Sequence, residues 1–365
     1  MTTTTTTGPS VRFTLPQGGE ATAPPERRGV SRDGVRLLVA RSAGQAADHR
    51  IHVEHRVFHD LPELLEPGDI VVVNTSATLP AALDGRRPDG RMAVVHVSTT
   101  LDDGSWVVEV RRVDGTGSDP DVVVGTDLEL PGDVRLRLDE SYPEPGLAAS
   151  RLWRATVTPG TALPTYLARH GRPIAYSYVN GRFPLADYQT VFATHQGSAE
   201  MASAARPFTA PLVVRLVARG ITVAPIMLHA GVSSPEAHEA PAPERFDVPA
   251  STARLVNDAR TAGRRVVAVG TTVVRALESA AAPDGTVHSA RGWTDVVLGP
   301  DRPVRVVTGL VTGLHAPGAS HLLLLEAVAG ADLTRAAYVA AVERRYLWHE
   351  FGDSTLFLPE RLGAR

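Results

Sequence analysis

Three short turns rich in small and hydroxyl-bearing residues hold most of the side chains that could do chemistry in this sequence. The first turn, Gly270-Thr271-Thr272, follows an apolar run and opens a stretch of helical character. Glycine lets a backbone approach a ligand closely, and the N–H groups at a helix start favour a carboxylate or phosphate. Arg275 and Glu278 follow, three residues apart, and therefore share a helical face. The turn predicts an anion-binding site; a capped helix with a surface ion pair is the alternative.

Each of the other two turns carries a histidine at the end of an apolar run. His229 is followed by Gly231, and His315 is followed by Pro317 and by Ser320, which is placed to cap the next helix. Histidine titrates near physiological pH and can act as an acid or a base, although a loop histidine bonded to the backbone is the plainer interpretation. Ligands of α/β sheets gather at the carboxyl ends of strands. Together the three turns predict one pocket.

Other kinds of site have little support. The sequence has no cysteine, which excludes disulfides, thiolate metal sites and a cysteine nucleophile, and fits a reducing cytoplasm. The histidine-rich run 48–59 suggests a metal, but its alternation is that of a strand, which places neighbouring histidines on opposite faces. There is no P-loop, no GxGxxG and no GxSxG motif. We expect no metal site.

Composition narrows the class of protein. Of the 365 residues 43% are hydrophobic, enough for two domains or for one domain with an insertion. The net charge of −3 argues against a general nucleic-acid coat, although a local arginine patch could still bind RNA. The N-terminal threonine run is not a signal peptide, and no apolar run is long enough for a bilayer. We expect a cytoplasmic monomer with no membrane partner.

Helices and strands must position these turns, and the patterns of apolar residues along the chain predict two domains. Residues 1–28, rich in Thr, Pro and Gly, predict a flexible arm. Residues 29–78 and 159–365 alternate helical and strand patterns and predict an α/β sandwich with a mixed central sheet. Residues 79–158 carry short alternating runs between Gly, Asp and Pro turns, which predict an inserted antiparallel β-barrel.

The individual elements follow from the same patterns. Main-domain strands are expected at 36–40, 70–73, 221–228, 265–269 and 304–311, and helices at 211–219, 251–261, 271–281, 320–329 and 333–345. Barrel strands are expected at 93–97, 106–111, 122–124, 128–130, 134–138 and 152–157.

The order of motifs along nearly the whole chain resembles the S-adenosylmethionine:tRNA ribosyltransferase-isomerase family of queuosine biosynthesis. The most distinctive matches are Tyr188-Gln189-Thr190 and the stretch Gly270–Ser279. Further matches are Asn74 after its apolar run, Gly197-Ser198, Phe208-Thr209, Leu228–Gly231, His315-Ala316-Pro317 and Phe351-Gly352-Asp353. The α/β domain with an inserted β-barrel is also the fold of that family.

The resemblance implies a reaction. The family moves the ribosyl part of S-adenosylmethionine onto 7-aminomethyl-7-deazaguanine at a tRNA wobble position, and adenine and methionine leave. The sulfonium acidifies the neighbouring ribose carbon, a base removes that proton, and an acid assists the departure of adenine. No metal or redox cofactor is required; S-adenosylmethionine is a substrate and tRNA the macromolecular partner.

The resemblance and the three turns give the candidate site. We expect His315 to act as acid or base, with His229 as second candidate, and Glu278 to orient a bound group. The expected substrate-binding residues are Asn74, Tyr188, Gln189, Thr190, Gly231, Gly270, Thr271, Thr272, Arg275, Pro317, Ser320 and Asp353.

The chain also departs from the family pattern, losing groups that are cationic or acid–base capable. Thr75-Ser76-Ala77 stands where the family has Asp-Thr-Arg, and Pro80-Ala81-Ala82 lacks the further Arg that the family has shortly after the Pro. Ala205-Arg206-Pro207 replaces Gly-Leu-His, Val232–Glu236 replaces Gly-Thr-Phe-Arg-Pro, and Pro317–Ser320 replaces Pro-Lys-Ser-Thr. They motivate an alternative, a diverged paralogue that uses S-adenosylmethionine with a small-molecule acceptor in secondary metabolism. A binding protein without catalysis is the third reading.

Overall fold

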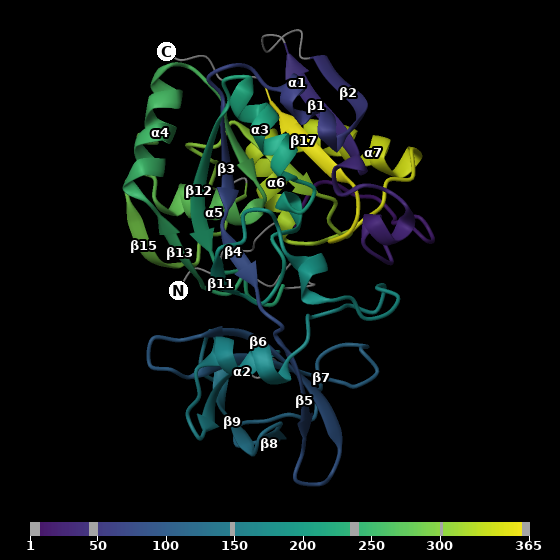
Figure 1. Cartoon of the computed structure of the whole chain (residues 1–365), viewed down its shortest axis with the longest axis vertical. Coiled ribbons are helices and arrows are strands. Elements are labelled where there is room, and N and C mark those ends of the chain that lie inside the picture. Colours follow the sequence, from purple (N-terminus) through teal and green to yellow (C-terminus); the bar gives the residue numbers. More distant parts are fainter. Residues whose placement is uncertain (1–7, 44–49, 147–149, 234–240, 300–301, 360–365) are drawn as a thin grey trace.

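The computed structural model describes residues 8–43, 50–146, 150–233, 241–299 and 302–359. It shows a larger α/β part and a smaller barrel that lies below it in the view of Figure 1. The larger part is a nine-stranded mixed sheet with helices, and the smaller part is a closed six-stranded antiparallel barrel. The predicted fold class is confirmed.

The main sheet combines strands from both ends of the chain, in the order β15-β13-β12-β3-β14-β16-β17-β1-β2. Its strands are β1 (Arg36–Ala43), β2 (Arg50–Val57), β3 (Ile70–Asn74), β12 (Thr222–Leu228), β13 (Glu244–Val248), β14 (Val266–Val269), β15 (Ala290–Thr294), β16 (Gly309–Gly313) and β17 (Ser354–Leu358). The strands β12, β3, β14 and β16 run parallel to one another. Their carboxyl ends therefore lie at one edge of the sheet.

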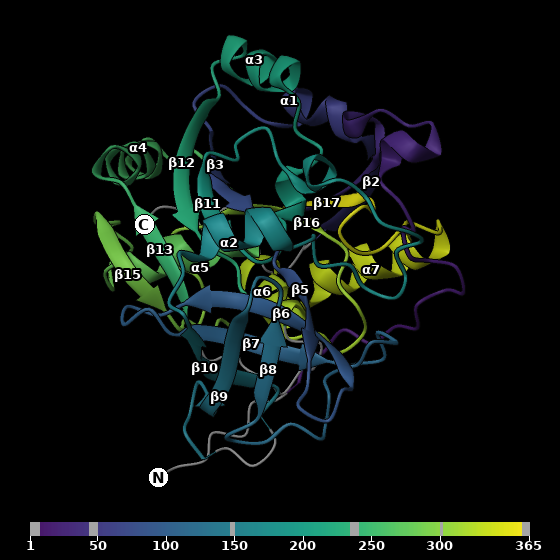
Figure 2. The same ribbon diagram turned by 60° about the horizontal axis from the view of Figure 1, so that its bottom comes forward.

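Helices cover both faces of this sheet (Figure 2). They are α1 (Leu61–Leu64), α3 (Ala210–Ala218), α4 (Ala250–Thr261), α5 (Thr271–Ser279), α6 (His321–Ala329) and α7 (Ala331–Glu343). Alternate residues of β3 serve the two sides: Val72 packs in the cluster with Leu277 of α5, and Val71 packs in the cluster with Leu212 of α3. A continuous apolar run such as Ile70–Asn74 suits a strand that is covered on both faces.

The barrel closes in the order β10-β7-β6-β5-β8-β9. Its strands are β5 (Ala82–Arg86), β6 (Met92–Thr100), β7 (Trp106–Arg111), β8 (Asp127–Leu130), β9 (Val134–Tyr142) and β10 (Leu152–Thr158). In β9, Leu136 and Leu138 are buried whereas Arg135 and Arg137 are exposed, which is the alternation that predicted the barrel. The helix α2 (Leu163–His170) packs Leu167 into the barrel core, although it lies after the expected boundary.

Two expected elements differ from the structure, and one barrel strand was not expected. The run 122–124 is not a strand, and Val123 and Val124 are each 62% exposed. The strand expected at 304–311 is β16, which begins only at Gly309, because the backbone just before it bonds to a side chain described below. The barrel strand β5 was not expected, since Asp84-Gly85 interrupts its alternation.

The expected N-terminal arm is packed against the main domain over residues 8–28, and residues 1–7 lie outside the described residues. Val11 is buried, and the Ser10 backbone N–H donates to Glu326 over 2.8 Å. The Ala21 N–H donates to the Trp348 carbonyl, and the Trp348 N–H to the Gly19 carbonyl. Composition alone underestimates the order of this segment, because a few buried contacts and backbone hydrogen bonds suffice to hold it against the main domain.

Two further expectations concern the histidine-rich run and the membrane. The run 50–57 is the strand β2, as its alternation predicts, and pairs antiparallel with β1; His49 lies outside the described residues. Within the described ranges, no helix combines the length and the apolar character that a membrane crossing requires.

Candidate active site

The three turns singled out in the sequence meet at the carboxyl edge of the parallel strands. Asn74 ends β3, His229 follows β12, Gly270 follows β14 and Gly313 ends β16. Hydrogen bonds join these ends: the Leu228 N–H donates to Asn74 Oδ1 over 3.0 Å, and the Gly270 N–H donates to a carbonyl of β16 over 2.8 Å. This edge is where doubly wound sheets bind ligands.

Asn74 holds the centre of this edge. Its side chain is fully buried, and its Nδ2 donates to the Leu228 carbonyl over 2.8 Å. Its Oδ1 also accepts from the Ser76 N–H over 3.0 Å, and Nδ2 reaches Thr272 Oγ1 at 3.4 Å. Because these bonds use both ends of the amide, Asn74 positions β12 and the start of α5 and is not free to bind a substrate through its side chain.

His229 lies in a cluster of hydroxyl groups. Its Nδ1 is 2.7 Å from Ser76 Oγ, which is 2.6 Å from Ser198 Oγ. Ser198 Oγ also accepts from the Ala230 N–H over 2.9 Å. The cluster forms because β4 (Ser76–Thr78) pairs in parallel with β11 (His195–Ser198) beside the end of β12.

The environment of His229 fixes its position and its charge. A Cβ on Gly197 would lie within 2.5 Å of three atoms of the His229 imidazole, so only glycine leaves room for the ring. Burial, with smaller contributions from the positive charges of Arg245 and His195, lowers the pKa of His229 to about 4. The imidazole is therefore neutral at pH 7 and able to accept a proton.

The start of α5 has the geometry expected of an anion-binding turn. Gly270 has φ = 94°, a region that favours glycine, and is the N-cap of α5. The first N–H groups of a helix have no partner within the helix, so Thr271 and Thr272 present donors toward the strand edge.

Arg275 and Glu278 do not form the surface pair that was the alternative, and both are buried. Arg275 pairs with Glu244 of β13 and donates to the carbonyls of Thr294 and Val296 over 3.2 Å each. Glu244 in turn accepts from the Gly231 N–H over 2.9 Å. Arg275 therefore supports the turn after His229 indirectly, and the expectation that its side chain binds substrate needs correction.

The expected orienting role of Glu278 also needs correction. Its Oε2 accepts from the Arg305 N–H over 2.8 Å, and its Oε1 accepts from the N–H groups of Val306 and Val307 over 2.9 and 3.1 Å. The carboxylate is committed to the backbone ahead of β16, which explains why that strand starts late.

His315 lies in a compact polar group beyond β16. Its Nε2 is 3.0 Å from Thr312 Oγ1, its N–H donates to Tyr338 Oη over 3.1 Å, and its ring stacks on His321 with centroids 4.6 Å apart. Burial, followed by the charges of His321 and His349, lowers the pKa of His315 well below the usual value. It is also neutral at pH 7.

The loop after His315 lacks the side-chain cap that the sequence predicts. Pro317 is exposed. Ser320 is the N-cap of α6, but its side chain makes no capping bond because its backbone is helical, with φ = −57° and ψ = −26°.

Tyr188, Gln189 and Thr190 secure β4. The Gln189 side chain accepts from the Thr78 N–H over 3.0 Å and donates to its carbonyl over 2.8 Å, as a neighbouring strand would. The Tyr188 carbonyl accepts from Thr78 Oγ1 over 3.0 Å. Gln189 and the Tyr188 backbone therefore position the strand that carries Ser76, whereas Thr190 Oγ1 accepts from the Phe192 N–H of its own turn over 3.3 Å.

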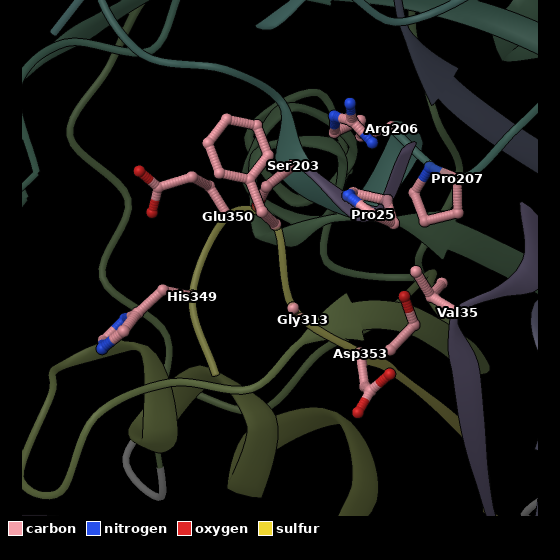
Figure 3. Close-up of a pocket in the computed structure, with 12 residues that line it drawn as sticks. Pro25, Val35, Ser203, Arg206, Pro207, Gly313, His349, Glu350 and Asp353 are labelled. Carbon is pink, nitrogen blue, oxygen red and sulfur yellow. The ribbon is translucent and has the colours of Figure 1, made fainter. Parts of the chain in front are cut away.

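Asp353 lines one small pocket together with Gly313 and with Arg206 and Pro207 of the departure at residues 205–207 (Figure 3). Asp353 accepts from the Arg36 and Leu347 N–H groups over 2.9 and 2.8 Å and pairs with the Arg36 guanidinium. Arg206 is buried and pairs with Glu26 over 2.8 Å. The cavity volume is about 10 Å³, room for roughly one water molecule.

Sequence reasoning missed Ser76 and Glu244 and did not assign a role to Ser198. Ser198 lies in a motif that matched the family, which was an available signal. Ser76 stands inside a departure and Glu244 inside no motif, so only the three-dimensional arrangement identifies them. Residues 234–236 of another departure lie outside the described residues.

Comparison with known proteins identifies the family of this chain. A family model described as queuosine biosynthesis protein matches residues 9–357. The S-adenosylmethionine:tRNA ribosyltransferase-isomerase of Acidiphilium cryptum is 34% identical over 358 residues, covering 91% of this chain and 96% of its own length. That of Symbiobacterium thermophilum is 36% identical over 342 residues, covering 90% and 94%.

A solved structure gives the same result. The S-adenosylmethionine tRNA ribosyltransferase of Thermotoga maritima is 28% identical, covers 95% of this chain and 99% of its own, and has a TM-score of 0.51. The chain therefore belongs to the queuosine biosynthesis family, together with these S-adenosylmethionine:tRNA ribosyltransferase-isomerases.

Proposed function

We propose that this protein transfers and isomerises the ribosyl group of S-adenosylmethionine onto 7-aminomethyl-7-deazaguanine in tRNA, forming epoxyqueuosine. The observation that carries the proposal is identity of 34–36% to two such enzymes over nearly the whole chain. The strand-edge arrangement supports it, since His229, His315 and the start of α5 all follow parallel strands at the edge where α/β sheets bind their ligands.

The chemistry needs a proton acceptor beside the ribose carbon that the sulfonium acidifies. The lowered pKa values of His229 and His315 leave both imidazoles neutral at pH 7, which is the form that accepts a proton. The Ser76–His229 contact orients one ring, and the Thr312–His315 contact orients the other. The protonated imidazole then serves as the acid that assists the departure of adenine.

A second candidate function, transfer to a small-molecule acceptor, is favoured by what stands at the departures. Ala77 is 7% exposed on β4, beside the Ser76 cluster, where the family carries an arginine. Pro207 has no side-chain donor where the family carries a histidine. These positions supply neither the charge nor the proton donor of the family pattern.

One experiment separates the two functions. The purified protein is incubated with S-adenosylmethionine alone and with tRNA that bears the aminomethyl base, and adenine, methionine and the mass of the nucleoside are measured. We expect adenine release that depends on this tRNA, together with the matching gain in nucleoside mass. Adenine release that tRNA does not stimulate would favour a small-molecule acceptor, and no release under either condition would contradict both functions.

A further inference from the structure

A second cavity, of about 230 Å³, lies between the barrel and the segment that returns from it to the main sheet. The barrel contributes residues of β6 and β7 and of the turn after β7, and the returning segment contributes residues between 172 and 188. This cavity is far larger than the one beside Asp353. Four arginines line it: Arg111, Arg112, Arg172 and Arg182.

The charge of this cleft is positive. Arg111 pairs with the buried Glu109 over 3.1 Å, and Arg172 pairs with Asp84 over 2.7 Å. Arg112 and Arg182 are exposed, and in the described parts of the chain neither has a carboxylate within salt-bridge distance. Asp114, on the same turn as Arg112, interacts electrostatically with it. The guanidinium of Arg182 and part of the charge of Arg112 therefore remain beyond what the nearby carboxylates neutralise, in a protein whose net charge is −3.

The lining also includes flat and apolar surface. Phe183, Val94 and Val113 lie in the same cavity, and Val113 is 62% exposed. Guanidinium groups beside an aromatic ring suit a ligand that alternates anionic groups with flat rings. A nucleic-acid strand alternates phosphates with flat bases in this way, whereas a peptide does not regularly combine anionic groups with flat rings.

One segment of the chain links the wall of the cleft to the strand-edge site. Tyr188 lines the cleft, and its carbonyl accepts a hydrogen bond from Thr78 Oγ1 on β4. Two residues before Thr78, Ser76 contacts His229. The backbone of Tyr188 thus connects the wall of the cleft to β4, the strand that carries Ser76.

We propose that this arginine cleft binds the phosphodiester backbone of the single-stranded nucleotides that flank the base to be modified. The inference rests on the proposed function, because it identifies the surface by which the tRNA acceptor is held. The cleft supplies cations from the barrel and from the returning segment, in a chain that lacks the family's arginines at Ala77 and near Ala82.

The test compares Arg112→Ala/Arg182→Ala with a matched control, Arg219→Ala/Arg254→Ala, whose two arginines are exposed in and beside the helices α3 and α4. Binding of labelled tRNA bearing the aminomethyl base is measured by anisotropy between 50 and 200 mM salt. Each lost single-strand phosphate contact changes the slope of log K against log salt by about 0.7. We expect a slope smaller by about 1.4, and affinity at 0.1 M salt weaker by about 25-fold.

Three further measurements make the result specific. The control should keep the wild-type slope, and Arg112→Lys/Arg182→Lys should restore most of it, because a lysine also neutralises a phosphate. Calorimetry should show that the alanine variant binds S-adenosylmethionine as the wild type does, which reports that the strand-edge site is intact.

Two outcomes would overturn the inference and are distinguishable. If the wild type modifies tRNA and the alanine variant keeps its affinity and salt slope, the cleft is not the RNA surface but the proposed function stands. If the wild type binds adenosine monophosphate through these arginines and does not bind tRNA, the cleft serves a free nucleotide, and both the inference and the tRNA activity fail.

Discussion

Replacing Glu278 by glutamine tests whether this buried carboxylate serves the fold or the substrate. The carboxylate accepts three backbone N–H groups from Arg305, Val306 and Val307 and holds the chain as it enters β16. In Glu278→Gln, Oε1 still accepts two of these donors, but an NH₂ group replaces Oε2 opposite the Arg305 N–H. One charge-assisted bond is lost and two donors face each other.

The magnitude follows from that geometry. A hydrogen bond to a charged group contributes about 1.5–3 kcal/mol, and the remaining two bonds weaken because the acceptor loses its charge. We therefore expect the free energy of unfolding of the main domain to fall by about 2–4 kcal/mol. Because the Glu278 carboxylate bonds to backbone and not to a substrate, adenine release per folded molecule should stay within a few-fold of the wild type.

Urea unfolding followed by circular dichroism measures the first quantity, and adenine release well below the unfolding transition measures the second. The control is Glu343→Gln at the exposed end of α7, which should leave both unchanged. If Glu278→Gln unfolds at the wild-type urea concentration but loses adenine release, the carboxylate acts on a bound substrate and the structural role is refuted.

Three other predictions concern the site and its supports. Gly197→Ala should displace the His229 ring and abolish most adenine release, whereas Gly160→Ala, whose added Cβ meets nothing within 4 Å, should not; parallel turnover assays decide this. Because the pKa of His229 is about 4 when folded and about 6.5 when unfolded, its stabilising contribution is complete above pH 6.5 and is lost as the pH falls toward 4. Unfolding free energies at pH 7 and 4.5 should therefore differ less in His229→Gln than in the wild type, and an equal difference would contradict the assigned shift. Thr209→Ala removes the side-chain acceptor for the Leu212 N–H at the start of α3 and should cost about 1 kcal/mol of unfolding free energy, with no change in affinity for S-adenosylmethionine.

The sequence predicted those elements best whose pattern of apolar residues also shows which faces are buried. The apolar run 70–73 implied a strand covered on both faces, and the alternation 134–138 implied a barrel strand with one face inward. The run 122–124 satisfied a similar criterion and is nevertheless a loop that pairs with no strand in the described part of the chain. Periodicity describes the faces of a segment but does not supply its partner.

The candidate site shows the same limit more strongly. The strand-end rule placed His229, Gly270 and the region of His315 at one edge, and the parallel pairing of the preceding strands agrees with that placement. Nothing local relates Ser76 to Ser198, which are 122 positions apart and meet only through the pairing of β4 with β11. The helical spacing of Arg275 and Glu278 likewise gave their face but not their partners, which lie on other elements.

The order of strands in the main sheet has a consequence for how the protein is made. The strand β1 pairs on one edge with the neighbouring β2 and on the other with β17, so that second edge awaits residues 354–358 while the ribosome completes nearly the whole chain between them. The barrel strands, by contrast, all lie between residues 82 and 158 and are available to pair early. We expect the barrel to form first during synthesis, whereas the edge of the sheet carrying β1 and β2 exposes unpaired backbone until late. That edge is then the segment with the greatest need of chaperone protection.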